Sequence, residues 1–465
     1  MGVDYDVDLA VIGSGGAAMS AAIAASQAGK SVVLVERGVL GGTCVNIGCV
    51  PSKTLLAAAG ARHAALTNPF KGAPTSAAPV NLGDLVAQKD ALIERLRDAK
   101  YADVAAAYGF QVRPGQAGNL DGDTLAVDGQ ALRARAYLVA TGATPAIPEV
   151  VGLDSVDRLT STTAMQATEL PESLVVIGGG YVGMEQAMLF AHLGTRVSVV
   201  GRLAPHAEPE AAQRLREVFT DDGITVVEER ATTVAREPGP QEVVVTTDSG
   251  EQVRGAQVLV ATGRLPRTDG LNLAAAGVDV DERGFVVVDQ TQRTSNPRVW
   301  AAGDVSGAPQ YVYAAAAGGQ YAALNALTED RYPPAGRVDY AGFPAVVFTR
   351  PQAASAGLTE DEALTRGHAC DCRVLDLSDV PRALVQHDTR GAVKVVADAV
   401  SGKVLGVHAL ADGAGEIMLA ATYAIKSGMT VDDLADTWAP YLTMSESLRI
   451  VAGLFRNQMP TSCCA

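Results

Sequence analysis

The sequence is short of positive charge. Its 465 residues include 37 Lys and Arg against 52 Asp and Glu, so the formal net charge is −15. This balance argues against nucleic acid or an anionic membrane surface as a partner, because both are polyanions. The first eight residues hold three Asp and no Lys or Arg, whereas a signal peptide starts with a basic segment. We therefore expect a cytoplasmic protein.

Long uninterrupted apolar runs are also lacking. The stretch 9–29 carries no charged residue, but Gly13, Gly15 and Gly16 divide it into a strand-like run and an alanine-rich helix. A membrane span needs about 20 consecutive apolar residues in one helix, so we expect none here. A chain of 465 residues with 48% hydrophobic content predicts two to four domains with sizeable cores.

Cysteine is rare, and its six residues form three close pairs. In a reducing compartment such pairs are more typical of redox or metal-binding groups than of a disulfide framework. Two exposed or partly buried thiols are the simpler interpretation of the middle pair, and a Cys-x-Cys metal site is the alternative. The pairs are Cys44 with Cys49, Cys370 with Cys372, and Cys463 with Cys464.

A dinucleotide-binding fingerprint opens the chain. Residues 7–12 predict a buried strand, a G-x-G-x-x-A turn and a helix follow, and a second strand over 31–35 ends at Glu36. The turn lets the backbone approach a pyrophosphate at a helix N-terminus, and the acid receives a ribose hydroxyl. The turn residues expected at the nucleotide are Gly13, Gly15, Gly16 and Ala18.

The segment Gly41-Gly42-Thr43-Cys44-Val45-Asn46-Ile47-Gly48-Cys49-Val50-Pro51-Ser52-Lys53 follows directly. Pro51 suits the first turn of a helix, which places Cys49 at or just before a helix N-terminus. The free amides and the helix dipole there favour a thiolate, and Lys53 adds positive charge one turn further on. The segment predicts a reactive cysteine pair with one unusually acidic thiol; a merely structural disulfide is the alternative.

A second fingerprint begins with a predicted strand over 174–177 and continues through Gly178, Gly180 and Gly183. The position that corresponds to Glu36 is Gly201 here, and Arg202 follows it. An acid there would repel a 2′-phosphate, whereas an arginine accommodates one. The second site therefore favours NADPH over NADH, with a solvated surface charge as the alternative interpretation of Arg202.

The segment around Cys44 and Cys49 resembles the redox-disulfide motif of the pyridine nucleotide–disulfide oxidoreductases. The resemblance spans essentially the whole chain and implies an α/β fold of the glutathione-reductase type, with two Rossmann-like dinucleotide-binding domains and a C-terminal α+β dimerisation domain. It implies FAD and NADPH as cofactors and a homodimer whose active sites are shared across the interface. The implied domains are 1–147 and 266–335 for FAD, 148–265 for NADPH, and 336–465 for the interface.

The resemblance also assigns further residues to the cofactors. An A-T-G pattern recurs where the chain leaves and re-enters the flavin domain, and Asp304 matches the acid of the second flavin motif. Tyr181 is expected to shield the nicotinamide site, and Glu185 to pair with Lys53 beside the flavin. The remaining implied contacts are Gly42, Thr43, Thr141 and Gly142 for FAD, and Gly263 for NADPH.

The C-terminal region departs from the disulfide-reducing members of the family. Those members have a catalytic His-Pro-Thr segment, with a Glu five residues after the His. Here Glu446 is retained, but Tyr441 stands in place of the histidine. A tyrosine with a pKa near ~10 is a poor proton shuttle at neutral pH. Reduction of a thiol-bound metal ion, unlike reduction of an organic disulfide, requires no protonation of a leaving thiolate.

The chain therefore resembles the members that reduce Hg(II) to Hg(0). Cys463 and Cys464 are too close for a relaxed disulfide, but thiolates suit a soft metal ion. We expect them to capture Hg(II) from small thiols and deliver it to Cys44 and Cys49, and we expect the hydroxyls of Tyr101 and Tyr441 to line the path. A thioredoxin or other disulfide reductase of the same family is the nearest alternative, and a non-catalytic metal-sequestering protein is a more distant one.

Overall fold

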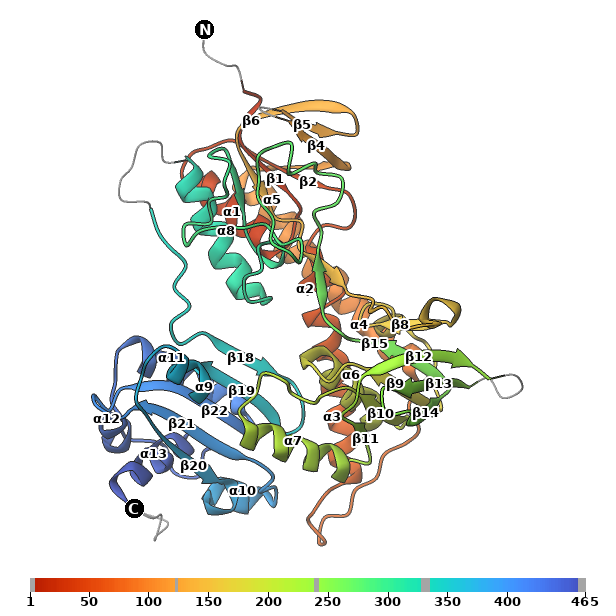
Figure 1. Ribbon diagram of the computed structural model, residues 1–465, viewed down its shortest axis with the longest axis vertical. Helices are drawn as coiled ribbons and strands as arrows, with labels where there is room; N and C mark the ends of the chain where they lie inside the picture. The colour runs from red at the N-terminus through yellow and green to blue at the C-terminus, as the bar shows by residue number, and fades with distance from the viewer. Residues whose placement is uncertain (1–4, 122–123, 238–241, 328–334, 459–465) are drawn as a thin grey trace. The chain divides into compact units, whose positions relative to one another are not determined.

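The computed structural model describes residues 5–121, 124–237, 242–327 and 335–458. Their packing divides the chain into two compact units, each built from three stretches (Figure 1). Unit 1 contains the described residues of 1–55, 83–146 and 263–339, and unit 2 those of 56–82, 147–262 and 340–465.

A mixed seven-stranded sheet forms the centre of unit 1. Leu9 and Val11 pack on one of its faces, and Ala10 and Ile12 pack on the other. Because both faces are buried, the strand is apolar throughout instead of alternating. The strand order is β3-β2-β1-β6-β5-β4, with β17 paired to β6: β1 (Val7–Ile12), β2 (Val32–Glu36), β3 (Gln111–Pro114), β4 (Ala117–Asp121), β5 (Thr124–Val127), β6 (Gln130–Val139) and β17 (Val299–Ala301).

Helices α1 and α8 pack closely together against one face of this sheet (Figure 1). A Cβ atom on Gly319 would lie 2.0 Å from the carbonyl oxygen of Ala17, so only glycine permits this approach. The abundance of Ala and Gly in both helices thus has a packing cause. The helices of this part of the chain are α1 (Gly16–Gln27), α2 (Gly42–Asn46), α3 (Cys49–Leu66), α4 (Leu82–Arg97), a π-helix (Asp98–Ala102), α5 (Asp103–Tyr108), a 3-10 turn (Asp304–Ser306) and α8 (Val312–Leu327). From Leu56 on, the residues of α3 belong to unit 2.

The chain leaves unit 1 and returns to it at neighbouring points. Strands β7 (Ala143–Pro145) and β16 (Arg264–Pro266) form an antiparallel pair. The Ala146 N–H donates to the carbonyl oxygen of Gly263 at 2.9 Å. Adjacent exit and entry points are what an inserted compact segment requires.

Unit 2 contains a parallel sheet of the order β11-β10-β9-β15-β8. Its central strand β9 leads into α6 and then into the adjacent β10, which is the βαβ arrangement of a nucleotide-binding fold. A small antiparallel sheet, β12-β13-β14, accompanies it. The elements are β8 (Arg158–Thr160), β9 (Ser173–Ile177), α6 (Tyr181–Leu193), β10 (Arg196–Val200), α7 (Pro209–Asp221), β11 (Thr225–Val227), β12 (Ala231–Arg236), β13 (Val243–Thr247), β14 (Gln252–Gly255), β15 (Gln257–Val260) and 3-10 turns at Leu153–Ser155 and Ala164–Gln166.

The C-terminal part of unit 2 is an antiparallel sheet of the order β18-β19-β22-β21-β20. Ile417, Met418 and Val451 of α11 and α13 join the strand residues in one buried cluster. No described helix is both long enough and apolar enough to cross a membrane. The elements are β18 (Pro344–Val347), β19 (Gln352–Gly357), α9 (Glu360–Thr365), β20 (Cys370–Asp376), α10 (Pro381–Gln386), β21 (Ala392–Asp398), β22 (Val404–Ala411), α11 (Ala414–Lys426), α12 (Val431–Asp436), α13 (Glu446–Gly453) and 3-10 turns at Leu377–Asp379 and Leu454–Arg456.

Candidate active site

The first glycine turn forms a backbone cradle in unit 1. A Cβ on Gly13 would lie 2.4 Å from the Ala140 carbonyl oxygen, and one on Gly42 would lie 2.5 Å from the Gly15 Cα. Helix α1 begins directly after Gly15, and no side chain caps its first amides. These amides are therefore available to an anionic ligand. The cradle fits the pyrophosphate of a dinucleotide, as the sequence predicts.

Two acidic side chains, those of Glu36 and Asp304, are expected at the dinucleotide that this cradle would bind. The Ser14 hydroxyl donates to Glu36 Oε2 at 2.6 Å, and the Gly38 N–H donates to Oε1 at 2.7 Å. These bonds fix the carboxylate at the end of β2, where a ribose is expected. Burial raises the pKa of Asp304, and Arg264, whose Nε lies 3.6 Å from the carboxylate, opposes that rise.

The cysteine pair lies where two short helices succeed each other. Cys44 belongs to α2, and Cys49 is the first residue of α3, which confirms its expected place at a helix N-terminus. Both cysteines are thiols in this structure. A Cβ on Gly48 would lie 2.9 Å from the Thr43 carbonyl oxygen, so the turn between the cysteines depends on glycine.

Cys49 and Lys53 set the electrostatic environment of the Cys44 thiol. A hydrogen bond to Cys49 raises the pKa of Cys44, burial and negative charge on Cys49 raise it further, and Lys53 lowers it. The pairing with Cys49 therefore favours the protonated form of the Cys44 thiol. Lys53 lies close enough to contribute positive charge to the pair.

Tyr101 also belongs to this neighbourhood. It lies in the π-helix (Asp98–Ala102) between α4 and α5. A Cβ on Gly41 would lie 3.6 Å from the Tyr101 Cδ2 atom. Burial, and then the negative charges of Cys44 and Cys49, raise the pKa of Tyr101 to about 12. Its hydroxyl is therefore protonated at any physiological pH.

The second glycine turn repeats the cradle in unit 2. A Cβ on Gly183 would lie 1.9 Å from the Gly178 carbonyl oxygen, and one on Gly178 would lie 2.4 Å from that of Ala261. In contrast, no atom lies within 4 Å of a Cβ on Gly180, which precedes the uncapped start of α6. Space and amides there fit a second dinucleotide. Burial raises the pKa of Tyr181, the first residue of α6, and the nearby Glu362 adds to the effect.

The loop after β10 carries the predicted 2′-phosphate contact. Arg202 is exposed, and its own carbonyl oxygen would lie 2.3 Å from a Cβ on Gly179. Glu228, which the sequence analysis does not single out, accepts the Leu203 N–H at 3.0 Å and thereby holds this loop. Glu228 lies just beyond β11, so no local motif marks it.

Glu185 has a defined partner within unit 2. Its side chain is buried, and Oε1 accepts the Phe348 N–H at 3.0 Å. Lys53 belongs to unit 1, so the expected Lys53–Glu185 pair stays a prediction.

The C-terminal segment presents Tyr441 beside a buried acid. Tyr441 is half exposed, whereas Glu446 at the start of α13 is buried. Glu446 Oε2 accepts the Leu442 N–H at 3.3 Å, and Leu442 has a φ of 60°. A branched residue in the left-handed region is strained, so Glu446 holds a strained turn next to Tyr441. Cys463 and Cys464 lie outside the described residues.

The other cysteine pair sits on β20, at the edge of the C-terminal sheet. Cys370 and Cys372 are both partly buried thiols. Burial and the neighbouring Glu360 raise the pKa of Cys372 to about 12. Two partly buried thiols are the simpler of the two interpretations that the sequence analysis gives for this pair; the other is a Cys-x-Cys metal site.

Two dinucleotide cradles and a dithiol at a helix N-terminus together define a nucleotide-dependent dithiol oxidoreductase. The family profile of the "Pyridine nucleotide-disulphide oxidoreductase" matches residues 7–319, and the profile of its dimerisation domain matches residues 343–452. The chain belongs to the pyridine nucleotide–disulfide oxidoreductases. This membership confirms the expected fold class and the expected cofactors, FAD and NAD(P)H.

The chain is also similar to individual named proteins of this family. The chain is 49% identical over 469 residues to a mercuric reductase of Streptomyces lividans, covering 98% of each chain. It is 42% identical over 468 residues to a mercuric reductase of Staphylococcus aureus, covering 99% of this chain and 85% of the relative. A solved structure, the Cu(II) complex of the HOCl-induced flavoprotein disulfide reductase RclA from Escherichia coli, aligns with a TM-score of 0.84 at 27% identity, over 96% of this chain and 100% of the other.

Proposed function

We propose that this protein reduces Hg(II) to Hg(0) with NADPH, through FAD and the Cys44–Cys49 pair, and that it serves mercury detoxification. The overall reaction is NADPH + Hg(II) → NADP⁺ + H⁺ + Hg(0), which balances two electrons. The observation that carries the proposal is the likeness to mercuric reductases over 98% of the chain. Two further features support it: Tyr101 lies near the cysteine pair, and Tyr441 stands where the disulfide-reducing members have a catalytic histidine.

The cofactors would be held by the two cradles. Gly13, Gly15, Gly42 and Glu36 would hold FAD, together with Gly16, Ala18, Thr43, Thr141, Gly142 and Asp304. Gly178, Gly180 and Gly183 would hold NADPH, together with Tyr181, Glu185, Arg202 and Gly263. When bound, they supply two electrons to the cysteine pair. Exposure leaves the Arg202 guanidinium available for a 2′-phosphate, which supports NADPH over NADH.

The chain's own residues then bind Hg(II) and release Hg(0). Cys49, at the helix N-terminus and near Lys53, is stabilised as a thiolate. Cys44, with its raised pKa, gives up its proton as the metal ion binds, since thiolates are the ligands of soft ions. Tyr101 stays protonated and provides a neutral hydroxyl next to both sulfurs. Hg(0) has no further affinity for thiolates and leaves.

The dimer completes the proposal. The chain has the family's dimerisation domain, and we infer a homodimer in which Tyr441, Glu446 and the pair Cys463–Cys464 of one subunit serve the cysteines of the other. Glu446 acts there by holding the Tyr441 turn. A cytoplasmic location, where NADPH is available, is part of the same proposal.

Substrate selectivity tests this function. Purified holoprotein is assayed for NADPH oxidation with Hg(II) in excess small thiol, with oxidised glutathione, and with oxidised thioredoxin. We expect turnover with Hg(II) alone, and its loss under limiting thiol when Cys463 and Cys464 are replaced by Ser. Turnover with a disulfide, together with inhibition by Hg(II), would instead establish a disulfide reductase.

A further inference from the structure

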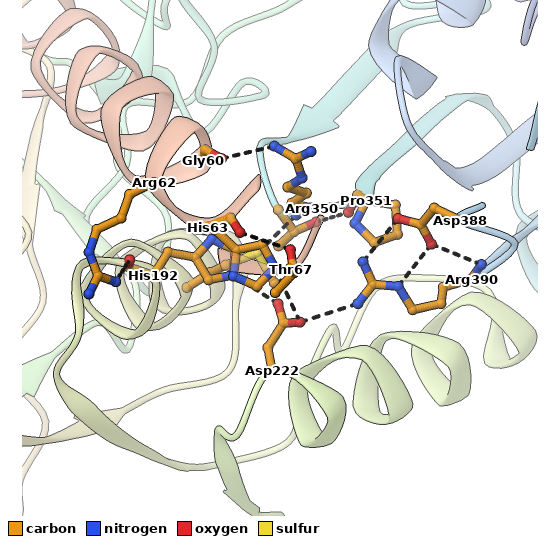
Figure 2. Close-up of polar contacts among 12 residues, drawn as sticks. Gly60, Arg62, His63, Thr67, His192, Asp222, Arg350, Pro351, Asp388 and Arg390 are labelled. Atoms are coloured by element: carbon orange, nitrogen blue, oxygen red, sulfur yellow. Dashed lines mark hydrogen bonds and ion pairs between the residues drawn. The ribbon is translucent and has the colours of Figure 1, made fainter. Parts of the chain in front are cut away.

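Two histidines and an aspartate meet inside unit 2, apart from any residue that the proposed function uses (Figure 2). His63 comes from α3, His192 from α6, and Asp222 from the C-terminal end of α7. Their side chains are 12%, 4% and 4% exposed. Among the described residues, no other group of three His, Cys, Asp or Glu side chains brings its ligand atoms within 4.8 Å of one another.

The ligand atoms converge on a small volume. His192 Nε2 lies 2.8 Å from Asp222 Oδ2, and His63 Nε2 lies 3.7 Å from Oδ1 of the same carboxylate. The two rings stack with centroids 3.7 Å apart and planes 19° apart. Both imidazoles therefore present the same nitrogen to one carboxylate.

Small movements would turn these spacings into those of a tetrahedral metal site. With bonds of ~2.1 Å from Zn(II) to nitrogen and oxygen, tetrahedral ligand atoms lie about 3.4 Å apart. The 2.8 Å contact must open by about 0.6 Å, and the stacked rings must tilt so that both lone pairs point to the ion. To bind the ion through Nε2, the His192 ring must carry its proton on Nδ1, which is the tautomer of a neutral imidazole ligand.

Two arginines and a second aspartate surround the cluster. Arg390 Nη1 donates to Asp222 Oδ1 at 3.2 Å, and both Arg390 and Arg350 are near enough to affect His63. Asp388 pairs with the Arg390 guanidinium at 2.9 and 3.0 Å. Arg390 thereby orients the Asp222 carboxylate, as hydrogen-bonding neighbours of metal ligands do.

We propose that His63, His192 and Asp222 form a binding site for a divalent ion of the Zn(II) class, with water as the fourth ligand. Imidazole and carboxylate ligands without a thiolate suit Zn(II) and disfavour a soft ion such as Hg(II). The site is therefore not a second substrate site. It ties α3, α6 and α7 together, so its role is to stabilise unit 2.

Zinc stoichiometry tests the proposal. Full-length, FAD-loaded protein with Cys44 and Cys49 oxidised is dialysed against Zn(II), and bound zinc per chain is measured for the wild type and for His192→Gln and Asp222→Asn. The matched controls are His206→Gln and Asp221→Asn, which replace exposed residues of the same types. We expect the two cluster variants to lose about one equivalent of zinc and the controls to lose none.

A second readout separates metal binding from simple loss of structure. Zn(II) should raise the thermal midpoint of the wild type and of both controls but not that of the cluster variants. Where a buried substitution prevents folding, judged by FAD content, His63→Gln replaces it, because His63 is the most exposed of the three. Equal zinc content and equal thermal shifts in all variants would overturn the proposal.

Discussion

Gly180 and Gly183 lie three residues apart in the second dinucleotide-binding fingerprint, but the structure requires glycine at the two positions for different reasons. A Cβ on Gly183 would lie 1.9 Å from a backbone oxygen, whereas one on Gly180 would meet nothing within 4 Å. We therefore predict that Gly183→Ala damages the fold of unit 2, and that Gly180→Ala damages nucleotide binding while the fold is retained.

The magnitudes follow from the contacts. An ordinary non-bonded contact is about 3.5 Å, so Gly183→Ala forces a backbone shift of about 1.6 Å. Overpacking of this kind costs about 1–3 kcal/mol or more, which exceeds the ~1 kcal/mol that helix propensity gains from Ala. A shift of this size belongs at the upper end of that range, so the net loss is about 2 kcal/mol. With about 2–4 °C per kcal/mol for a unit of this size, we expect the thermal midpoint to fall by about 4–8 °C. Gly180→Ala changes only a helix N-cap and should cost under ~1 kcal/mol.

Two measurements separate these effects. Calorimetry gives the thermal midpoint of each variant, and titration of the oxidised enzyme with NADP⁺ gives the affinity. We expect Gly180→Ala to weaken binding at least ~10-fold, about 1.4 kcal/mol, because its methyl group occupies the space left for the pyrophosphate. A Gly180→Ala protein that binds normally but melts early, or a Gly183→Ala protein with wild-type stability, would refute the reasoning.

Three further predictions concern other parts of the chain. Tyr101→Phe should lower kcat with Hg(II) about 10-fold, ~1.4 kcal/mol, while the visible spectrum still shows that NADPH reduces the cysteine pair. Since the pKa of Tyr101 is raised to about 12, the change in rate that Tyr101→Phe causes should be the same at every pH below about 10. Lys394→Met should cost about 3–5 kcal/mol in urea unfolding, because it leaves the buried Glu208, now 2.9 Å from Lys394 Nζ, without its charge partner; a loss under ~1 kcal/mol would contradict this. The pKa of His63 falls to about 4 on folding. Between about pH 6.5 and 4 the unfolded chain therefore binds more protons than the folded one, and the free energy of unfolding decreases as the pH falls, by up to ~3 kcal/mol. In chelator-treated protein, His63→Gln should flatten this pH dependence, and His206→Gln should not.

The cradles could be predicted from the sequence because their signals are local. A strand, a glycine turn and a helix follow one another within one stretch, and the required residue types are set by the backbone. The position of Cys49 was predictable for the same reason, since Pro51 and the alanine-rich run mark a helix start. Family resemblance added the residues whose roles no local pattern reveals, such as Asp304 and Tyr441.

The remaining features depend on contacts between distant segments. The π-helix that carries Tyr101 separates α4 from α5, and no sequence pattern marks it. No sequence pattern marks the left-handed backbone of Leu442, because this conformation is stabilised by the hydrogen bond from the Leu442 N–H to the Glu446 carboxylate. The His63–His192–Asp222 cluster gathers residues from three elements, so neither spacing nor composition indicates it.

The central claim is that the two electrons of NADPH reach Hg(II). The most direct measurement is the amount of elemental mercury purged from an anaerobic reaction, per NADPH consumed, in the presence of excess small thiol. The account predicts a ratio near one for the wild type and no elemental mercury for Cys44→Ser or Cys49→Ser. NADPH consumption without elemental mercury, or elemental mercury from the cysteine variants at the wild-type rate, would contradict it.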